Sequence, residues 1–502
     1  MNLLDTNSRW VPVRADGGIG PLRWLSYRDL LCSDGTWRIS LTRDDMELAC
    51  LQLLVSLTQV IFLPKTLDEA EDRIDTPLSE NEFDAAVASY VDWFDLDHPT
   101  QPFMQTRGVE AKEATPIQKL MVGLPEGNNH CFFNPAGEIK QISAPIAAIA
   151  LFNQAMNCPS FGGGFKGSLR GSAPITTLVD ANDLRRQVWS NVVNADLLLK
   201  DLPTLEFDPA RDRPTWVEPI AANATLHATD IGLARGLFWQ PAHVELIPGT
   251  DGGVCDVLRT QVDRLYVGFR KAKFKFTLEG VWPHPHGARS LKVKKGGAEI
   301  RFQSFTTTAP GWTRLADLVA EREAEKDEGT APAAPVKQAR ALEIAPLHLL
   351  VGGYRNKQAA VIERRHELMT LGRGWAGNTD AIRLVVETGL AAKDALRHKL
   401  YFAVKGSKDK GLEGVAAPIH EIAEAHFYAR TESLMLDVIA DEQTFADWGS
   451  ARNGLIDNLS MHCRRIFAEL TDPYSLKPEL IPIIAWARRS LNNELKRLKE
   501  GK

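Results

Sequence analysis

Features that would place this 502-residue sequence in a membrane are missing. The longest apolar run, residues 48–64, is too polar to span a bilayer because it is interrupted by Gln52, Ser56, Thr58 and Gln59. The N-terminus, Met-Asn-Leu-Leu-Asp, has neither the basic start nor the apolar core of a signal peptide. Since 44% of residues are hydrophobic and 25% are charged, we expect a folded cytoplasmic protein without a membrane partner.

Cysteine is scarce, and no two cysteines form a Cys-x-x-Cys pair. The six cysteines are scattered along the chain, which is typical of reduced thiols in a cytoplasm. The hydrolase signatures His-Glu-x-x-His and Gly-x-Ser-x-Gly are also absent. The sequence therefore offers no convincing active site, and we expect no cofactor and no catalytic residue.

Three histidines leave one enzyme hypothesis open. His284 and His286 lie in Trp-Pro-His-Pro-His-Gly, and His243 ends the segment Phe-Trp-Gln-Pro-Ala-His. A metal-dependent hydrolase using these three side chains is the alternative function. However, histidines two residues apart among prolines fit no common zinc signature, so we expect no metal site.

An excess of positive charge is missing as well. The formal net charge is −5, whereas a free-standing nucleic-acid-binding protein is usually strongly basic. Any contact with nucleic acid must therefore be local, or shared with other subunits.

The pattern of elements predicts an α+β protein of two domains, because the chain is too long for one core. Residues 1–375 mix short strands, turns and helices and predict a large irregular domain. Residues 376–502 predict an antiparallel four-helix bundle, since apolar side chains recur at helical spacing. The four predicted helices are 379–403, 417–440, 442–471 and 477–499.

Two shorter predictions concern the larger domain. A helix is expected over 41–59, where Asp44 followed by Glu47 resembles a capping box, so the pair Asp44-Asp45 is interpreted as helix-start chemistry rather than metal ligation. Residues 320–337 are rich in charge, alanine and proline and predict a solvated loop.

The glycine run at residues 161–172, Phe-Gly-Gly-Gly-Phe-Lys-Gly-Ser-Leu-Arg-Gly-Ser, is the most informative segment. Glycine lets a backbone approach another molecule closely and leaves N–H groups accessible. The spacing Gly162-x-Gly164-x-x-Gly167 matches a dinucleotide fingerprint, but a predicted helix at 144–156 precedes it where that motif requires a strand. A contact loop and a plain surface turn both remain possible at this point.

Three further segments are basic or polar. Alternation over 269–276 would place Lys271, Lys273 and Lys275 on one face of a strand and Phe274 and Phe276 on the other. A hairpin is expected over 291–301, and Gly-Gly-Tyr-Arg-Asn-Lys-Gln-Ala at 352–359 predicts a turn followed by a helix over 361–366. Solvated sheet faces and a surface turn are the alternatives to a binding role.

Taken together, these segments resemble one family: CasA, the large subunit of the type I-E CRISPR surveillance complex Cascade. The resemblance covers nearly the whole chain and is weakest at 320–337 and in the helical bundle. It rests on ordered blocks: Arg-Asp-Asp-Met-Glu-Leu-Ala at 43–49, His-Pro-Thr-Gln-Pro-Phe-Met-Gln-Thr at 98–106, Phe-Gly-Gly-Gly-Phe-Lys at 161–166, Gly-Leu-Phe-Trp-Gln-Pro-Ala-His at 236–243, Trp-Pro-His-Pro-His at 282–286, Gly-Gly-Tyr-Arg-Asn at 352–356 and Glu-Arg-Arg-His at 363–366.

The resemblance implies a non-catalytic subunit that recognises the protospacer-adjacent motif of double-stranded DNA from the minor groove and starts strand separation for crRNA pairing. The implied partners are the crRNA-bound backbone, handle-binding and small subunits, double-stranded target DNA, and a helicase-nuclease that the subunit recruits. The implied DNA-binding residues are a glycine loop, a lysine finger and a glutamine wedge with its neighbour: Gly162, Gly163, Gly164, Lys273, Gln358 and Ala359. Phe132, Phe133 and Asn134 match the loop that members direct toward the crRNA handle and its binding subunit.

Two positions depart from the family pattern. Some members carry a cysteine-rich knuckle before the lysine segment, whereas Cys255 stands alone here, and we therefore expect no structural zinc. Lys357 adds a cation beside the wedge, for which we favour a phosphate contact over a solvent-facing role. Because the minor groove mainly separates A·T from G·C pairs, recognition should tolerate several motifs.

Overall fold

The computed structural model describes residues 1–15, 18–124, 137–294, 297–323 and 328–501, and the chain folds into two compact units. The first unit comprises Met1–Thr307, Arg322–Leu342 and Leu349–Leu368. The second unit comprises Thr308–Glu321, Glu343–His348 and Met369–Lys502. We call them the mixed unit and the helical unit. The division of the sequence after residue 375 stays a prediction of domain organisation.

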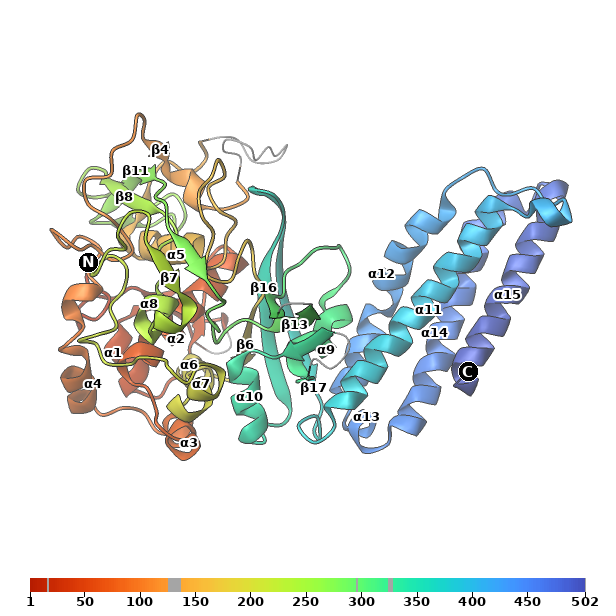
Figure 1. The fold of residues 1–502 in the computed structure, drawn as a ribbon, viewed down its shortest axis with the longest axis horizontal. Helices are drawn as coiled ribbons and strands as arrows, with labels where there is room; N and C mark the ends of the chain where they lie inside the picture. Colours follow the sequence, from red (N-terminus) through yellow and green to blue (C-terminus); the bar gives the residue numbers. More distant parts are fainter. Residues whose placement is uncertain (16–17, 125–136, 295–296, 324–327, 502) are drawn as a thin grey trace. The chain divides into compact units, whose positions relative to one another are not determined.

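The helical unit confirms the predicted C-terminal bundle. Its long helices lie side by side in Figure 1: α11 (Thr379–Lys405), α12 (Ile419–Ala440), α14 (Trp448–Thr471) and α15 (Ile481–Glu500). The expected third helix is interrupted at Asp447, whose carboxylate accepts a hydrogen bond from Ser450 N (3.2 Å) and so begins α14 separately from the short α13 (Glu442–Ala446). The predicted apolar stripes form the core, as in α15, where Ile484, Ala487, Leu491 and Leu495 are buried.

The mixed unit is built around two helices that are buried along most of their length. α2 (Asp44–Ile61) packs against α5 (Ala144–Met156), and both are buried on nearly every face, as expected of helices inside a large core. None of the described helices has the length and apolar character needed to cross a membrane. Together with small sheets, this arrangement confirms the α+β class.

The start of α2 corrects the predicted capping box. The residue before the helix is Arg43, which makes no side-chain cap, and Asp44 is the first helical residue. Glu47 instead accepts a hydrogen bond from Leu41 N (2.9 Å), so its carboxylate bonds further back along the chain than a capping box requires. Helix-start chemistry is retained, but through a different contact.

One sheet of the mixed unit carries the basic segment. β11 (Leu265–Ala272) pairs antiparallel with β8 (His243–Pro248), β4 (Thr115–Pro116) and β5 (Ile142–Ser143). The strand ends at Ala272, so the expected strand over 269–276 is too long. The alternation of exposure nevertheless continues beyond it, because Lys273 and Lys275 are exposed and Phe276 is buried.

A second sheet contains the longest hairpin of the described chain. Its order is β17 (Ala360–Leu371), β16 (Leu347–Lys357) and β6 (Thr176–Asp180), and Figure 1 shows β16 and β17 as a long two-stranded ribbon. The helix expected over 361–366 is wrong, since these residues belong to β17. The β-branched pair Val361 and Ile362, paired along β16, favours an extended chain.

The segment 320–337 also differs from expectation. β13 (Arg289–Lys294) pairs antiparallel with β14 (Gly297–Phe302), as predicted, and also with β15 (Glu328–Ala331). β15 leads into α10 (Ala334–Ala341), and Ala333 and Val336 are almost fully buried. The solvated loop is therefore wrong for residues 329–337, because small apolar side chains there pack into the core.

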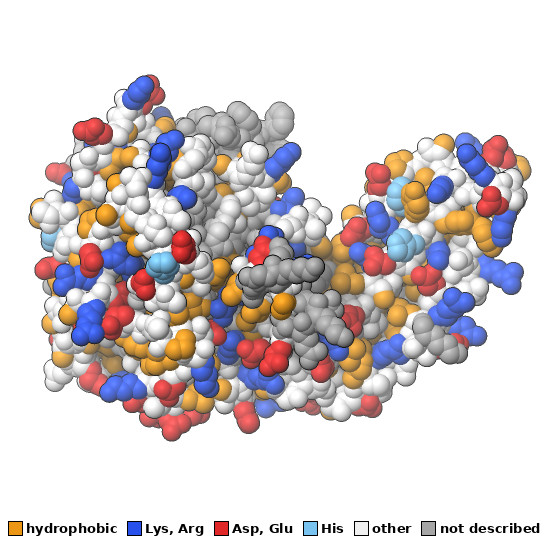
Figure 2. Space-filling view, in the orientation of Figure 1, with side chains coloured by type: hydrophobic (Ala, Val, Ile, Leu, Met, Phe, Trp, Pro, Cys, Tyr) orange, Lys and Arg blue, Asp and Glu red, His pale blue; other side chains and the backbone are white. Residues whose placement is uncertain are grey.

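The remaining elements are short. In the mixed unit these are β1 (Val11–Arg14), β2 (Arg23–Leu25), α1 (Tyr27–Cys32), β3 (Arg38–Ile39), α3 (Leu67–Asp75), α4 (Glu80–Val87), α6 (Leu184–Ser190), α7 (Ala195–Asp201), β7 (Thr225–His227), α8 (Leu233–Leu237), β9 (Gly253–Val254), β10 (Gln261–Val262) and β12 (Thr277–Glu279). The helical unit adds α9 (Leu315–Val319). Figure 2 shows acidic and basic side chains interspersed over the visible face of the mixed unit, which agrees with the near-balanced composition.

Candidate nucleic-acid interface

The glycine loop forms a tight turn that requires glycine. Phe165 N donates to Gly162 O (3.0 Å), and the central residues Gly163 and Gly164 have φ angles of 53° and 86°. Positive φ at both central positions is characteristic of a type I′ turn, which side chains with a Cβ disfavour. Gly163 and Gly164 are exposed, so the turn presents backbone to solvent.

The tip of the β16–β17 hairpin is a second strained turn. Gln358 is exposed and has a φ of 55°, which is uncommon for a residue other than glycine. The Asn356 side chain holds the tip, because its amide donates to Gln358 O and to Ser172 Oγ (3.1 Å) at the end of the glycine run. The bond to Gln358 O lies within the tip and supports its local conformation.

Lys273 completes the group. Its Nζ donates to Gly163 O (3.3 Å) and would lie 3.6 Å from a Cβ placed on Gly164. A Cβ on Gly162 would lie 3.2 Å from the Cβ of Ala359. The structure therefore brings together the predicted residues from three distant segments, although their role in DNA binding stays a prediction.

The glycine loop and the hairpin tip enclose an open hollow of about 480 Å³. It is lined by backbone and small or flexible side chains: Ser160, Gly162, Gly163, Gly164, Ser172, Lys357, Gln358, Ala359 and Ala360. Such a lining provides polar groups without bulk. It suits a ligand that must come close to the main chain.

Aromatic rings beside the glycine loop carry two cations that the sequence reasoning did not assign. Lys271 Nζ lies 4.9 Å from the ring centre of Phe161, and Lys166 Nζ lies 5.5 Å from that of Phe276. These distances are those of cation–π contacts. The interleaving of lysine and phenylalanine at 269–276 was the available signal, but nothing in the sequence paired it with Phe161.

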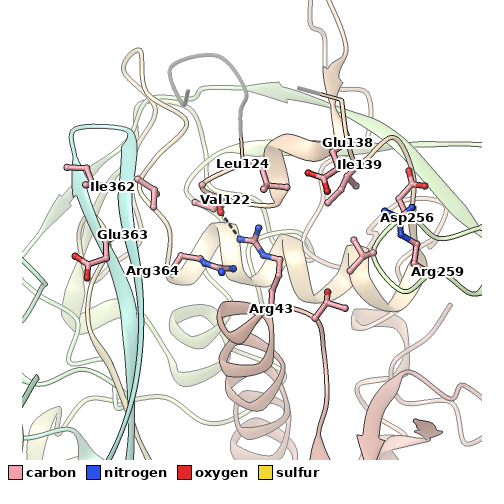
Figure 3. Close-up of a pocket in the computed structure, with 14 residues that line it drawn as sticks. Arg43, Val122, Leu124, Glu138, Ile139, Asp256, Arg259, Ile362, Glu363 and Arg364 are labelled. Carbon is pink, nitrogen blue, oxygen red and sulfur yellow. Dashed lines mark hydrogen bonds between the residues drawn. The ribbon is translucent and has the colours of Figure 1, made fainter. Parts of the chain in front are cut away.

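A larger cavity of about 590 Å³ lies elsewhere in the mixed unit (Figure 3). Figure 3 shows Arg43 donating to Val122 O (2.6 Å), and the side chain of Arg364 in β17 directed toward Arg43. Glu138, Asp256, Glu363 and Arg259 also line the cavity, so its charges are mixed.

Phe132, Phe133 and Asn134, assigned to the crRNA handle loop, lie outside the described residues.

The histidines of the hydrolase hypothesis are placed poorly for catalysis. His284 and His286 are fully buried, and His286 Nδ1 contacts Gln52 Nε2 (3.2 Å). Burial and the nearby Arg170 charge lower the pKa of His286 to about 3 and that of His284 well below its ordinary value. His243 is half-buried and contacts Thr106 Oγ1 (3.0 Å). Among the described residues, no group of three or more histidine, cysteine or acidic side chains is arranged to hold a metal ion.

Comparison with known proteins places the chain in a family. Residues 2–461 match the family described as CRISPR-associated protein Cse1. Cse1 of Thermobifida fusca is 19% identical, with a TM-score of 0.75 over 100% of this chain and 98% of that chain. CasA of Thermus thermophilus is 18% identical (TM-score 0.69; 99% and 99% covered), and a chain of a CRISPR RNA-guided surveillance complex is 16% identical (TM-score 0.69; 98% and 99% covered).

At these identities the structural likeness establishes the fold, and it extends over both units. The family match covers more than half of the sequence and includes the glycine run, Lys273 and the hairpin tip. The chain therefore belongs to the Cse1 family of CRISPR-associated proteins, the CasA large subunits of type I-E systems.

Proposed function

We propose that this protein is the DNA-recognition subunit of an RNA-guided surveillance complex of the Cascade type. It reads the protospacer-adjacent motif of double-stranded DNA from the minor groove and starts strand separation, without a catalytic step of its own. It assembles with crRNA-bound backbone, handle-binding and small subunits, and it recruits a helicase-nuclease after the crRNA has paired with its target. Sequence beyond the motif is read by base pairing.

The observation that carries this proposal is the meeting of three exposed elements at one place. The Gly163–Gly164 turn, the Lys273 ammonium and the Gln358 hairpin tip come from segments about 100 and 200 residues apart, yet they line or border one hollow. A minor groove about 6 Å wide admits backbone and slender side chains but not a helix. A glycine turn flanked by one flexible cation meets that requirement.

Lys273 is suited to move onto DNA. Its hydrogen bond to Gly163 O is exposed and long (3.3 Å), so exchanging it for a base-edge or phosphate acceptor costs little. The minor groove concentrates negative potential, which attracts a long cationic side chain. Because the protein's net charge is −5, other subunits must supply much of the attraction for the DNA backbone.

Gln358 is suited to act as a wedge. It stands at the tip of a long hairpin, and Asn356 fixes its backbone. Unstacking a base step costs a few kcal/mol, which new contacts must offset. A tip already held in a strained conformation adds little further ordering cost on binding.

The proposal is tested with the assembled crRNA complex. A duplex pool with randomised bases beside the target first identifies the preferred motif, and gel shifts then measure affinity for that duplex. Lys273→Ala and Gln358→Ala should each weaken duplex binding about tenfold or more, because each removes a groove contact of the size seen in base recognition. Binding to single-stranded target should not change.

Lys275→Ala is the matched control. Lys275 is an exposed lysine on the same segment and has the same charge. Its loss should alter duplex affinity far less than the loss of Lys273. Wild-type duplex affinity in the Lys273→Ala/Gln358→Ala double variant would contradict the proposed function.

A further inference from the structure

The two proposed DNA-contacting elements touch one another only weakly at the surface. The glycine run and the hairpin tip meet through the exposed Asn356–Ser172 hydrogen bond (3.1 Å) and at Gly162, where an added Cβ would lie 3.2 Å from the Cβ of Ala359. Exposed hydrogen bonds compete with water and contribute little to rigidity. Groove recognition nevertheless requires a fixed spacing between turn and wedge, so that spacing must be set deeper in the fold.

Tyr354 lies beneath the tip, in β16, four residues before Gln358. Its ring is 1% exposed, and its hydroxyl accepts a hydrogen bond from Asn153 Nδ2 (2.7 Å) and donates one to Asp45 Oδ2 (2.8 Å). Burial and the Asp45 carboxylate raise the pKa of Tyr354, so the hydroxyl keeps the proton that it donates. The hairpin is thereby joined to α5 and to the start of α2.

The glycine run is joined to the same group of side chains. Asn157, the residue that follows α5, donates to Asn153 Oδ1 (3.1 Å). Arg170, near the far end of the glycine run, donates to Asn157 Oδ1 (2.7 Å) and to Met156 O (3.1 Å). Residues 157 and 170 therefore close the base of the loop that presents the glycine turn.

Asp45 anchors the other side of this network. It accepts hydrogen bonds from Arg43 and from Arg364 Nη1 (3.2 Å), and Arg364 belongs to β17, so both strands of the hairpin reach one carboxylate. Burial alone raises the pKa of Asp45, but Arg43, Arg364 and Tyr354 together hold that pKa below its usual range. The carboxylate is therefore charged and fully engaged.

We propose that Tyr354 is a positioning residue for DNA recognition: through Asn153, Asn157 and Arg170 on one side and Asp45 on the other, it fixes the distance between the glycine turn and the Gln358 wedge. The inference rests on the proposed function. It assigns a role in motif recognition to a side chain that never reaches the DNA. A connected network of buried hydrogen bonds suits this task, because it favours one arrangement of the elements that it joins.

The variant Tyr354→Phe tests this role because it removes the hydroxyl and keeps the ring. In the assembled complex, affinity for the preferred duplex should fall about fivefold or more, while binding to single-stranded target stays unchanged. Tyr27→Phe is the matched control, since Tyr27 is fully buried in the same unit and its hydroxyl bonds Thr58 Oγ1 (2.9 Å) away from the glycine loop. It should lower thermal stability, because it removes a buried hydrogen bond, and leave duplex affinity unchanged.

A cross-link separates positioning from general destabilisation. Ser172→Cys and Asn356→Cys replace two side chains that already touch, so a disulfide between them fastens the loop to the hairpin. Two proteins that both carry the oxidised cysteine pair are compared, one with Tyr354 and one with Tyr354→Phe. The disulfide should give them the same duplex affinity. Reduction should abolish the rescue.

The outcomes distinguish this inference from the proposed function. If Lys273→Ala and Gln358→Ala weaken duplex binding but Tyr354→Phe does not, or if the oxidised cross-link fails to rescue Tyr354→Phe, the positioning role is overturned while the interface stands. If none of the three variants affects duplex binding, the proposed function itself fails. Selective loss with oxidative rescue supports both.

Discussion

The two units of this protein differ in where their decisive contacts lie along the chain. In the helical unit, buried residues of α15 from Ile484 to Leu495 recur every three or four positions, so the local sequence alone indicates which face of the helix is buried. In the mixed unit, the candidate interface joins Gly163, Lys273 and Gln358, which no periodic pattern connects. The packing of the helices is thus encoded in the local sequence, whereas the interface depends on contacts between residues that are far apart in the sequence.

One buried glycine in each unit shows how its surroundings would accept added volume. A Cβ on Gly236 in α8 would lie 2.2 Å from the indole of Trp282. A Cβ on Gly389 in α11 would lie 2.7 Å from the flexible end of Met435 and 2.9 Å from Trp312. Gly236 faces a locked ring at the shorter distance, whereas Gly389 faces the adjustable end of Met435 together with a buried ring.

Gly236→Ala should therefore have the largest effect on stability. Trp282 is almost fully buried, and its Nε1 donates to Ile231 O (3.0 Å), so the indole ring cannot shift to accommodate an added methyl group. We expect a loss of about 3 kcal/mol or more in the free energy of unfolding, measured by chemical denaturation. Gly389→Ala should lower it by a smaller amount, about 1 kcal/mol, because the end of Met435 can shift and the helix propensity of alanine offsets part of the crowding against Trp312. Equal losses for the two variants would break the comparison.

Buried histidines give the mixed unit a characteristic response to acid. The unfolded chain takes up a proton on His286 below a pKa of about 6.5, whereas the folded pKa is about 3, so falling pH favours unfolding. This histidine alone should cost about 2 kcal/mol between pH 8 and pH 5.

His286→Gln tests this dependence without removing every polar contact to Gln52. The difference in unfolding free energy between variant and wild type at pH 8 reports lost packing. The change in that difference between pH 8 and pH 5 reports the proton, and it should favour the variant by about 2 kcal/mol. A difference independent of pH would show that His286 is protonated equally in both states.

These contrasts explain which parts of the structure the sequence could predict. The long helices follow from local periodicity, and α5 was predicted with the bounds observed, 144–156. The prediction of a helix over 361–366 was wrong because these residues pair with β16 in the folded chain, and this pairing makes them a strand. The prediction of a solvated loop was wrong at 329–337 for the same reason. The charged residues nearby favoured a loop, but the alanines of this segment are buried in the folded chain.

The candidate site shows a similar limit. Motif resemblance supplied Gly162, Lys273 and Gln358, and the structure brings them together. Tyr354 lies in a block that resembles the family, but neither resemblance nor spacing gave a role to Tyr354 or Arg170, because a buried tyrosine and a buried arginine become informative only when their partners are known. Polar networks that join distant segments are therefore the part that sequence reasoning missed.

The smallest effect is expected at a local signal in the helical unit. Asn378 caps α11 by accepting a hydrogen bond from Ala381 N (3.3 Å), and its amide also donates to Phe445 O (3.1 Å). Asn378→Ala should lower the free energy of unfolding by about 1 kcal/mol, measured by denaturation of the full chain. Asn378→Asp keeps the cap acceptor and adds a negative charge that favours the helix N-terminus, although it replaces the donor to Phe445 with an acceptor, so it should cost less than the alanine variant. If both variants lower the free energy of unfolding by the same amount, the hydrogen bond to Phe445 accounts for the effect. The helical unit would then depend on contacts between residues distant in sequence, as the mixed unit does.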